Sequence, residues 1–176
     1  MKKIFTFNNV LAFLAMVILP LLAVPCFYVS GDRGITPTQE NSINFYQRIF
    51  GFTLYDANKE LIPGTGANMT VGFNPGLFLV FLFLILGILF LLAYNCVKQG
   101  SLKVIIKVLG SSFLLASGIM MCCALPLASY VDQVNTWIFE LTGATIAFGV
   151  IIIVIGAFSL ISLLFKKPQP KTVEEI

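Results

Sequence analysis

Four long apolar stretches, separated by short polar clusters, dominate the pattern of the chain. They cover approximately residues 10–30, 74–97, 108–131 and 138–165, and each contains at most one charged residue. An α-helix needs about 20 apolar residues to cross the hydrocarbon core of a bilayer, and each stretch reaches that length. The pattern therefore predicts an all-α membrane protein in which residues 1–176 form a single domain, a bundle of four transmembrane helices.

The first stretch follows two lysines, Lys2 and Lys3, and stays uncharged from Ile4 to Gly31. A cleaved signal peptide also begins with lysines and an apolar run, but that run is usually only about 7 to 15 residues long. We therefore expect the first stretch to be retained as a membrane anchor, with cleavage as the alternative.

The lysines and arginines predict how the four helices are oriented. In a four-span arrangement, Arg33, Arg48 and Lys59 lie on one side of the membrane. All the others lie on the opposite side: Lys2, Lys3, Lys98, Lys103, Lys107, Lys166, Lys167 and Lys171. Positive residues accumulate in cytoplasmic loops, so we expect a multi-pass protein of the cell membrane with both termini in the cytoplasm. The loop 31–73 is then extracellular, and residues 168–176 form a cytoplasmic tail.

The extracellular loop is patterned and is expected to fold. Thr36, followed by Pro37 and Gln39, has the form of a helix N-terminus with a capping box. Helical spacing then continues at Ile43, Tyr46, Ile49 and Phe50. The aromatic side of this short helix has to be buried, and we expect it to cap the bundle of its own chain. Lying on the membrane or facing a partner are the alternatives.

A short hairpin is expected after this helix. Gly51 would end the helix, and residues 52–55 and 60–62, joined by a turn at residues 56–59, have the pattern of two short strands. The predicted fold is thus a four-helix membrane bundle with a small folded extracellular loop, made of a short helix plus a hairpin.

Small residues gather in the third and fourth stretches, where they allow helix backbones to approach closely. The third stretch is therefore the expected centre of helix packing. The candidate packing residues are Gly110, Ser112, Ala116, Gly118, Cys122, Gly143, Ala147, Gly149 and Gly156. The second stretch, in contrast, is apolar on every side, which is typical of a helix that largely faces lipid.

The composition supports a membrane protein and argues against a nucleic-acid partner. Hydrophobic residues make up 58% and charged residues only 11% of the chain, and the mean hydropathy is +0.95; a water-soluble domain has about 45 to 50% apolar and about 25% charged residues. The net charge of +3 comes from lysines at the ends of the stretches, where membrane topology already explains them. The lipid bilayer is therefore the expected environment, and no nucleic acid is expected.

Several kinds of chemistry are absent. The chain contains no histidine, which excludes histidine-based catalytic triads, histidine-ligated haem and HExxH zinc sites within it. The four cysteines have no metal-type spacing, although a disulfide between Cys26 and Cys122 or Cys123 is geometrically conceivable. No charged side chain lies deep in a stretch, which argues against proton-driven transport. We expect no cofactor, no metal and no enzymatic activity; a lipid-modifying enzyme that uses Ser, Cys or Glu is a minor alternative.

The arrangement of four spans, inside termini, a large first outer loop and a small second one resembles that of claudin-type tetraspan proteins. These proteins share a tryptophan and a cysteine pair in the first outer loop, and residues 31–73 contain neither. The resemblance therefore covers topology only and implies no function.

Two functional hypotheses follow from these patterns. The first is a non-enzymatic assembly or accessory subunit that binds a membrane-protein partner or a second copy of itself through the small-residue faces and the outer loop. The second is a transport or channel component with an outward-facing cavity lined by Ser112, Ser117 and Cys122. The candidate cavity or interface residues are Glu140, Trp137, Ser117, Tyr46 and Phe50.

Overall fold

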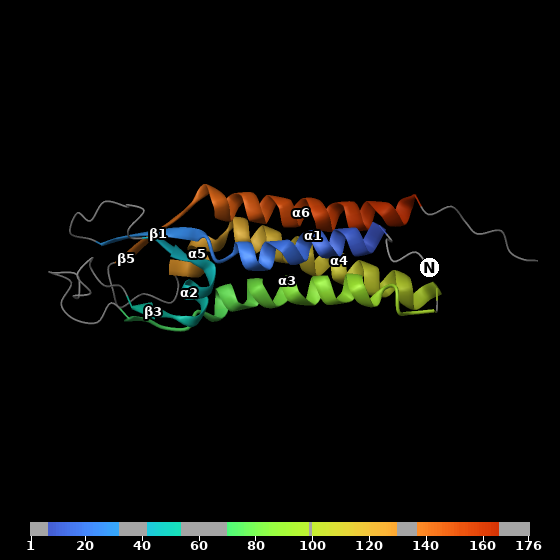
Figure 1. Ribbon diagram of the computed structural model, residues 1–176, viewed down its shortest axis with the longest axis horizontal. Coiled ribbons are helices and arrows are strands. Elements are labelled where there is room, and N and C mark those ends of the chain that lie inside the picture. The colour runs from blue at the N-terminus through green and yellow to red at the C-terminus, as the bar shows by residue number, and fades with distance from the viewer. Residues whose placement is uncertain (1–6, 32–41, 54–69, 99, 130–136, 166–176) are drawn as a thin grey trace, which may run out of the picture.

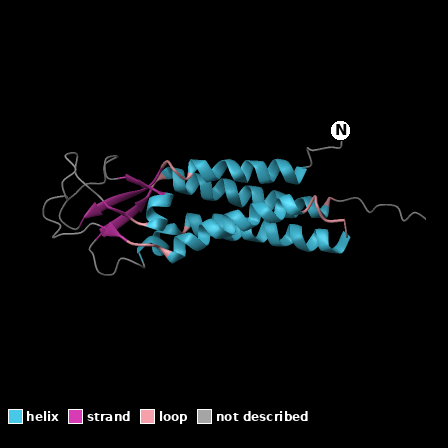
Figure 2. Ribbon diagram, turned by 60° about the horizontal axis from the view of Figure 1, so that its bottom comes forward, coloured by secondary structure: helices cyan, strands magenta, loops and turns pink. Residues whose placement is uncertain are grey.

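The longer helices of the protein lie along one axis, and the strands gather at one end of that axis (Figures 1 and 2). The structure is a computed structural model that describes residues 7–31, 42–53, 70–98, 100–129 and 137–165. Helices α1 (Phe7–Leu21), α3 (Pro75–Ala93), α4 (Gly100–Cys122) and α6 (Gly143–Leu164) lie side by side, and we call them the helical body. The opposite end from the strands is called the Lys107 end; α1 begins and α6 ends there.

Three of these helices, α3, α4 and α6, are long and apolar enough to cross a membrane. They correspond to the second, third and fourth apolar stretches and indicate a membrane protein. Helix α1 is apolar but has only 15 residues, which corresponds to about 22 Å of helix. The structure thus contains three candidate spans and one shorter apolar helix among its described residues.

The first apolar stretch is not helical over the whole range 10–30. Its helix ends at Leu21, and strand β1 (Pro25–Gly31) follows. Pro25 has no backbone N–H to donate to a helix, and the sequence that follows it, Cys-Phe-Tyr-Val, contains the aromatic and β-branched residues that favour strands. Pairing partners on both sides of β1 then stabilise the extended backbone.

The third and fourth stretches also differ from single continuous helices. Helix α4 stops at Cys122, and a separate six-residue helix, α5 (Ala124–Ser129), contains Pro126. The predicted span 138–165 begins with strand β5 (Trp137–Leu141) instead of helix. Helix α6 starts only after Thr142, whose backbone is extended.

A three-stranded antiparallel sheet joins segments that are far apart in the sequence. Its order is β2 (Ser42–Asn44), β1, β5, so that β1 lies in the centre. Phe27 is paired with Leu141 and Gly31 with Trp137. A second, two-stranded pair consists of β3 (Phe52–Thr53) and β4 (Thr70–Val71). The predicted hairpin is therefore corrected: β3 pairs with β4, and the predicted strand 60–62 lies outside the described residues.

Helix α2 (Phe45–Phe50) begins later than the sequence pattern indicated. Residues 42–44, which were expected to be helical, form β2, and the expected start at Thr36 lies outside the described residues. The capping box is made instead by Asn44 and Gln47: the Gln47 N–H donates to Asn44 Oδ1, and the Asn44 N–H donates to Gln47 Oε1. Gly51 ends the helix as predicted, with a φ of 98° that favours glycine.

The strand-bearing end is hydrogen-bonded to the helical body. The Asn74 N–H donates to the Ile49 carbonyl over 2.8 Å, which fixes the start of α3 against α2. The Thr142 hydroxyl donates to the Pro25 carbonyl over 3.0 Å, which fixes the start of α6 against β1. Because these bonds connect segments from distant parts of the chain, the sheet and the helices form one continuous structure.

Candidate functional site

The glycines of α4 and α6 lie in the contact between these two helices. A Cβ atom added at Gly118 would lie 2.7 Å from the Gly149 carbonyl oxygen, and one added at Gly149 would lie 2.6 Å from Cys122 Sγ. At Gly156 it would lie 3.1 Å from the backbone nitrogen of Leu115. The two backbones therefore approach so closely that only glycine fits at these positions without displacing a neighbour.

The other side of α4 packs against α3 in the same way. A Cβ atom at Gly110 would lie 3.2 Å from the Gly87 carbonyl oxygen, and one at Gly87 would lie 2.7 Å from the Leu114 side chain. Gly87 was not among the predicted packing residues, because a single glycine within a long aliphatic run does not form a pattern of small residues. Helix α4 is thus packed on two sides, as expected for the centre of helix packing.

Part of the predicted small-residue faces, at Gly110, Gly118, Gly149 and Gly156, contacts helices of the same chain. Three other candidates have little or no role in this packing: Ser112 and Ala147 are exposed, and Ala116 is half-buried. Gly143 is also exposed, and a Cβ atom added there would have no neighbour within 4 Å. Three glycines that were expected to contact a partner, Gly118, Gly149 and Gly156, thus lie in contacts within the chain.

The hypothetical cavity of Ser112, Ser117 and Cys122 is not formed by these side chains together. Ser117 is buried against α3, where its hydroxyl donates to the Val80 carbonyl over 2.9 Å. Cys122 is half-buried and faces α6, with its thiol 3.9 Å from the Ile146 carbonyl oxygen. Ser112 is exposed. The three side chains point to different surroundings and therefore do not line one cavity.

Helix α2 caps the helical body with one side and exposes the other. The Tyr46 hydroxyl donates to the Leu19 carbonyl over 2.5 Å, and its ring lies edge-on to Phe81 at 5.7 Å. Burial raises the pKa of the Tyr46 hydroxyl above its usual range. Phe50, at the other end of α2, has 57% of its side chain exposed. Capping of the helical body thus explains the contacts of Tyr46, but it does not explain the exposed side chain of Phe50.

Phe50 belongs to an aromatic cluster of Phe50, Phe73 and Phe78. The ring of Phe73 lies 5.4 Å from Phe78 and 6.5 Å from Phe50, and Phe50 lies 6.4 Å from Phe78. Phe73 is 49% exposed. Two of the three residues precede α3 in the chain and one lies in its first turn. The aromatic cluster therefore lies where the strand-bearing end meets the helical body.

Arg48 is a structural residue that the sequence pattern did not single out. It is fully buried, its guanidinium donates to the Ala128 carbonyl of α5, and it lies 4.6 Å from the centre of the Phe139 ring of β5. A buried arginine that contacts α5 and β5 from α2 connects three separate segments. In the sequence, the signal for this contact is the position of an arginine among the aromatic and apolar residues of a predicted helix.

The two remaining interface candidates lie on β5. Trp137 begins the strand with its backbone opposite Gly31, and Glu140 is exposed and paired with Tyr28. Within the described part of the chain, β5 has a neighbouring strand on one side only, so one edge of it carries no strand.

The four cysteines are free thiols, so the conceivable disulfide of Cys26 does not form. Cys26 is buried in β1, and burial raises the pKa of its thiol above the usual value, against smaller opposite effects of hydrogen bonds from Thr145 and Phe45. No three His, Cys, Asp or Glu side chains come together within residues 7–31, 42–53, 70–98, 100–129 and 137–165.

Comparisons of the chain with protein-family models, with curated proteins and with solved structures found no match. The geometry of the chain itself is therefore the basis for assigning a function.

Proposed function

We propose that the protein is a non-enzymatic assembly or accessory subunit of a membrane complex, and that the aromatic cluster contacts its partner. The observation that supports this proposal is that the neighbouring side chains of Phe50 and Phe73 are 57% and 49% exposed. Aromatic residues are enriched at protein interfaces, and contiguous exposed apolar patches are uncommon unless another molecule covers them.

The membrane arrangement that we propose has four crossings, made by α3, α4, α6 and the first apolar stretch, whose helix α1 alone is shorter than a full crossing. These helices lie side by side, and together they bring the chain back to the end at which it started (Figure 2). Lys98, Lys103 and Lys107 lie at or near the turn between α3 and α4. The positive-inside rule then favours a cytoplasmic Lys107 end and an extracellular strand-bearing end in the cell membrane.

The proposed occupant of the aromatic cluster is a second membrane protein in the same bilayer. The cluster lies beside the start of α3, at the level where the helical body leaves the membrane in this arrangement. A partner reaching that level must itself be inserted in the membrane or lie on it. The hydrogen bonds from Asn74 and Tyr46 hold the surrounding backbone in place, so that little ordering is required on binding.

Site-specific photo-crosslinking in the native membrane tests this proposal. A photo-reactive phenylalanine analogue at Phe50 is compared with the same analogue at Phe158, which is similarly exposed, at 55%, but lies within α6. We expect a discrete crosslinked protein from position 50 and only lipid adducts from position 158. A further variant, Phe73→Ser, should reduce the crosslink from position 50.

Lipid adducts alone at both positions would overturn the proposal and identify the aromatic cluster as part of the lipid-facing surface. A crosslink of position 50 to a second copy of the chain would support assembly and identify the complex as a homo-oligomer.

A further inference from the structure

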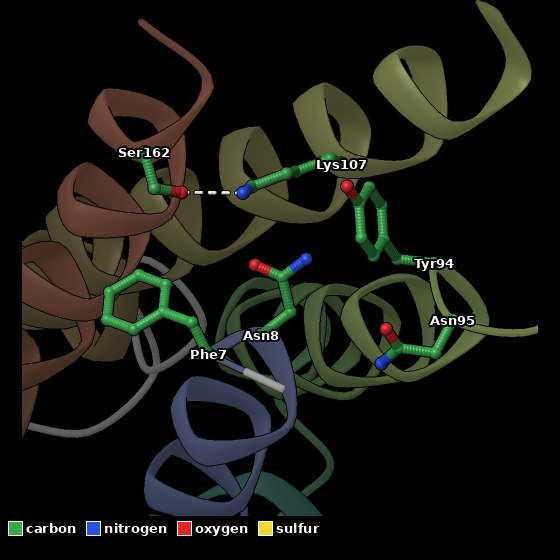
Figure 3. A pocket seen from close by; sticks show the side chains of 6 residues that line it. All are labelled: Phe7, Asn8, Tyr94, Asn95, Lys107 and Ser162. Atoms are coloured by element: carbon green, nitrogen blue, oxygen red, sulfur yellow. Dashed lines mark hydrogen bonds between the residues drawn. The ribbon is translucent and has the colours of Figure 1, made fainter. Parts of the chain in front are cut away.

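A pocket lined by both polar and apolar side chains lies at the Lys107 end, where the helices of the helical body meet (Figure 3). Its volume is about 320 Å³, at the lower end of the range for small-molecule sites. Residues from α1, the end of α3, α4 and α6 line it: Phe7, Asn8, Tyr94, Asn95, Lys107 and Ser162.

Among the described residues that line the pocket, Lys107 is the only one with a formal charge. Its side chain is only 4% exposed, and its ammonium donates to the Ser162 hydroxyl over 2.5 Å. The ammonium also lies 5.4 Å from the centre of the Tyr94 ring, which a cation prefers to approach face-on. The pocket is therefore positively charged and partly shielded from water.

Two asparagine side chains and the Ser162 hydroxyl also line the pocket; this hydroxyl itself donates to the Ser159 carbonyl over 2.7 Å. Asn8 is buried, and Figure 3 shows its amide pointing into the space beside Lys107. Asn95, on the rim, donates to Asn9 of α1, which joins α1 to the end of α3. One ammonium group with nearby amide and hydroxyl groups is the kind of lining that recognises a phosphate oxygen.

The position of the pocket favours a phosphate that belongs to a lipid. Lys107 is seven residues from the start of α4, a depth of about 10 Å along the helix. Phe7, at the rim, begins a row of exposed apolar residues along one side of α1: Phe7, Val10, Leu14, Val17 and Leu21. An acyl chain can lie along this row while its headgroup occupies the pocket.

We propose that this pocket binds the phosphate group of an anionic glycerophospholipid through Lys107. The proposal is independent of the partner assigned to the aromatic cluster, which lies at the other end of the helical body. It adds a specific lipid site to a chain whose lysines would otherwise only set its orientation.

Native mass spectrometry of the full chain in mild detergent tests the site with two added lipids, phosphatidylglycerol and phosphatidylcholine. We expect preferential binding of phosphatidylglycerol, and a roughly fivefold weaker affinity after Lys107→Gln. The matched control is Lys98→Gln, which removes an equal charge from an exposed lysine and should leave the affinity unchanged. Lys107→Arg keeps the charge and should retain the preference.

Equal affinities of the Lys107→Gln and Lys98→Gln variants would overturn the proposal. If Lys107→Gln does not fold, Asn95→Ala takes its place, because Asn95 is an exposed rim residue; unchanged phosphatidylglycerol binding by this variant would likewise overturn it. Soluble glycerol phosphate is added as a competitor. Displacement of the lipid by millimolar glycerol phosphate would show that the pocket binds a soluble phosphate compound. It would overturn the proposal that the bound phosphate belongs to a lipid.

Discussion

Individual small residues determine how closely α4 approaches its two neighbours. On the α6 side, glycines remove side chains from the contact, and the Ser111 hydroxyl lies 2.7 Å from the Ser159 hydroxyl. On the α3 side, Ser117 donates to a backbone carbonyl. In a membrane, where apolar burial contributes little to helix association, such close packing and interhelical hydrogen bonds are the main stabilising terms.

The substitution Gly118→Ala should lower the free energy of unfolding by about 1 to 3 kcal/mol, the usual cost of overfilling a packed site. The added methyl group would lie 2.7 Å from the Gly149 carbonyl oxygen, which is backbone and cannot rotate away. Thermal unfolding of the purified protein in one detergent measures the change.

The control for this prediction is Gly143→Ala, since an added Cβ at Gly143 meets nothing within 4 Å. Its stability should stay within about 0.5 kcal/mol of the parent protein. Equal stability of the two variants would show that the α4–α6 contact is looser than described.

At the scale of elements, the sequence predicted α3, α4 and α6 better than the strand-bearing end. The three helices follow from the length of their apolar runs, because a helix satisfies the backbone groups of such a run within the bilayer. Strands β1 and β5 lie within apolar runs that were predicted as helices, because a buried strand and a membrane helix have similar hydrophobicity. What distinguishes β1 is its pairing with β5, more than 100 residues away, and this pairing has no local signature.

The candidate sites also differ in whether they depend on residues close together in the sequence or on segments far apart in it. The close packing around Gly118 was predictable, because small residues at helical spacing in a membrane helix usually mark a close helix contact. The sequence could not indicate which helix this glycine-bearing face contacts, since such a face fits a helix of the same chain as well as one from another protein. The pocket around Lys107 depends on α1, α3 and α6 meeting there, so the lysine alone gave no indication of it.

Asn74→Ala should destabilise the contact between the start of α3 and α5 by about 2 kcal/mol, because it removes the cap of α3 and leaves the half-buried Leu127 carbonyl without this donor. The buried Asn74 side chain accepts from the Leu77 N–H over 3.0 Å and donates to the Leu127 carbonyl over 3.1 Å. Thermal unfolding in detergent measures the effect.

Asn44→Ala is the comparison, because Asn44 also caps a helix but its capping bonds are exposed. Its cost should be about 1 kcal/mol or less. If Asn74→Ala costs no more stability than Asn44→Ala, the bond to the Leu127 carbonyl does not stabilise the contact between α3 and α5.

At the scale of the whole molecule, the two ends of the helical body should face opposite sides of the membrane. Cys96 lies at the Lys107 end, and Glu140 lies at the strand-bearing end; both are exposed. In a chain whose other cysteines are replaced by alanine, a membrane-impermeant maleimide should label Glu140→Cys in intact cells. A chain that retains only Cys96 should be labelled only after the membrane is permeabilised.

Labelling of both positions in intact cells would contradict the proposed four crossings, and the reverse pattern would contradict the orientation. Either result would leave the packing of the helical body unchanged, because that packing depends on contacts within the chain.

The central position of β1 has a consequence for the order in which the protein is made. Strand β1 emerges from the ribosome early, but its partner β5 is synthesised only after α3 and α4. During most of translation one edge of β1 therefore lacks its final neighbour, and a sheet edge in that state readily pairs with other chains. Completion of the sheet requires β5, which directly precedes α6, so the strand-bearing end can be finished only when translation has nearly reached α6.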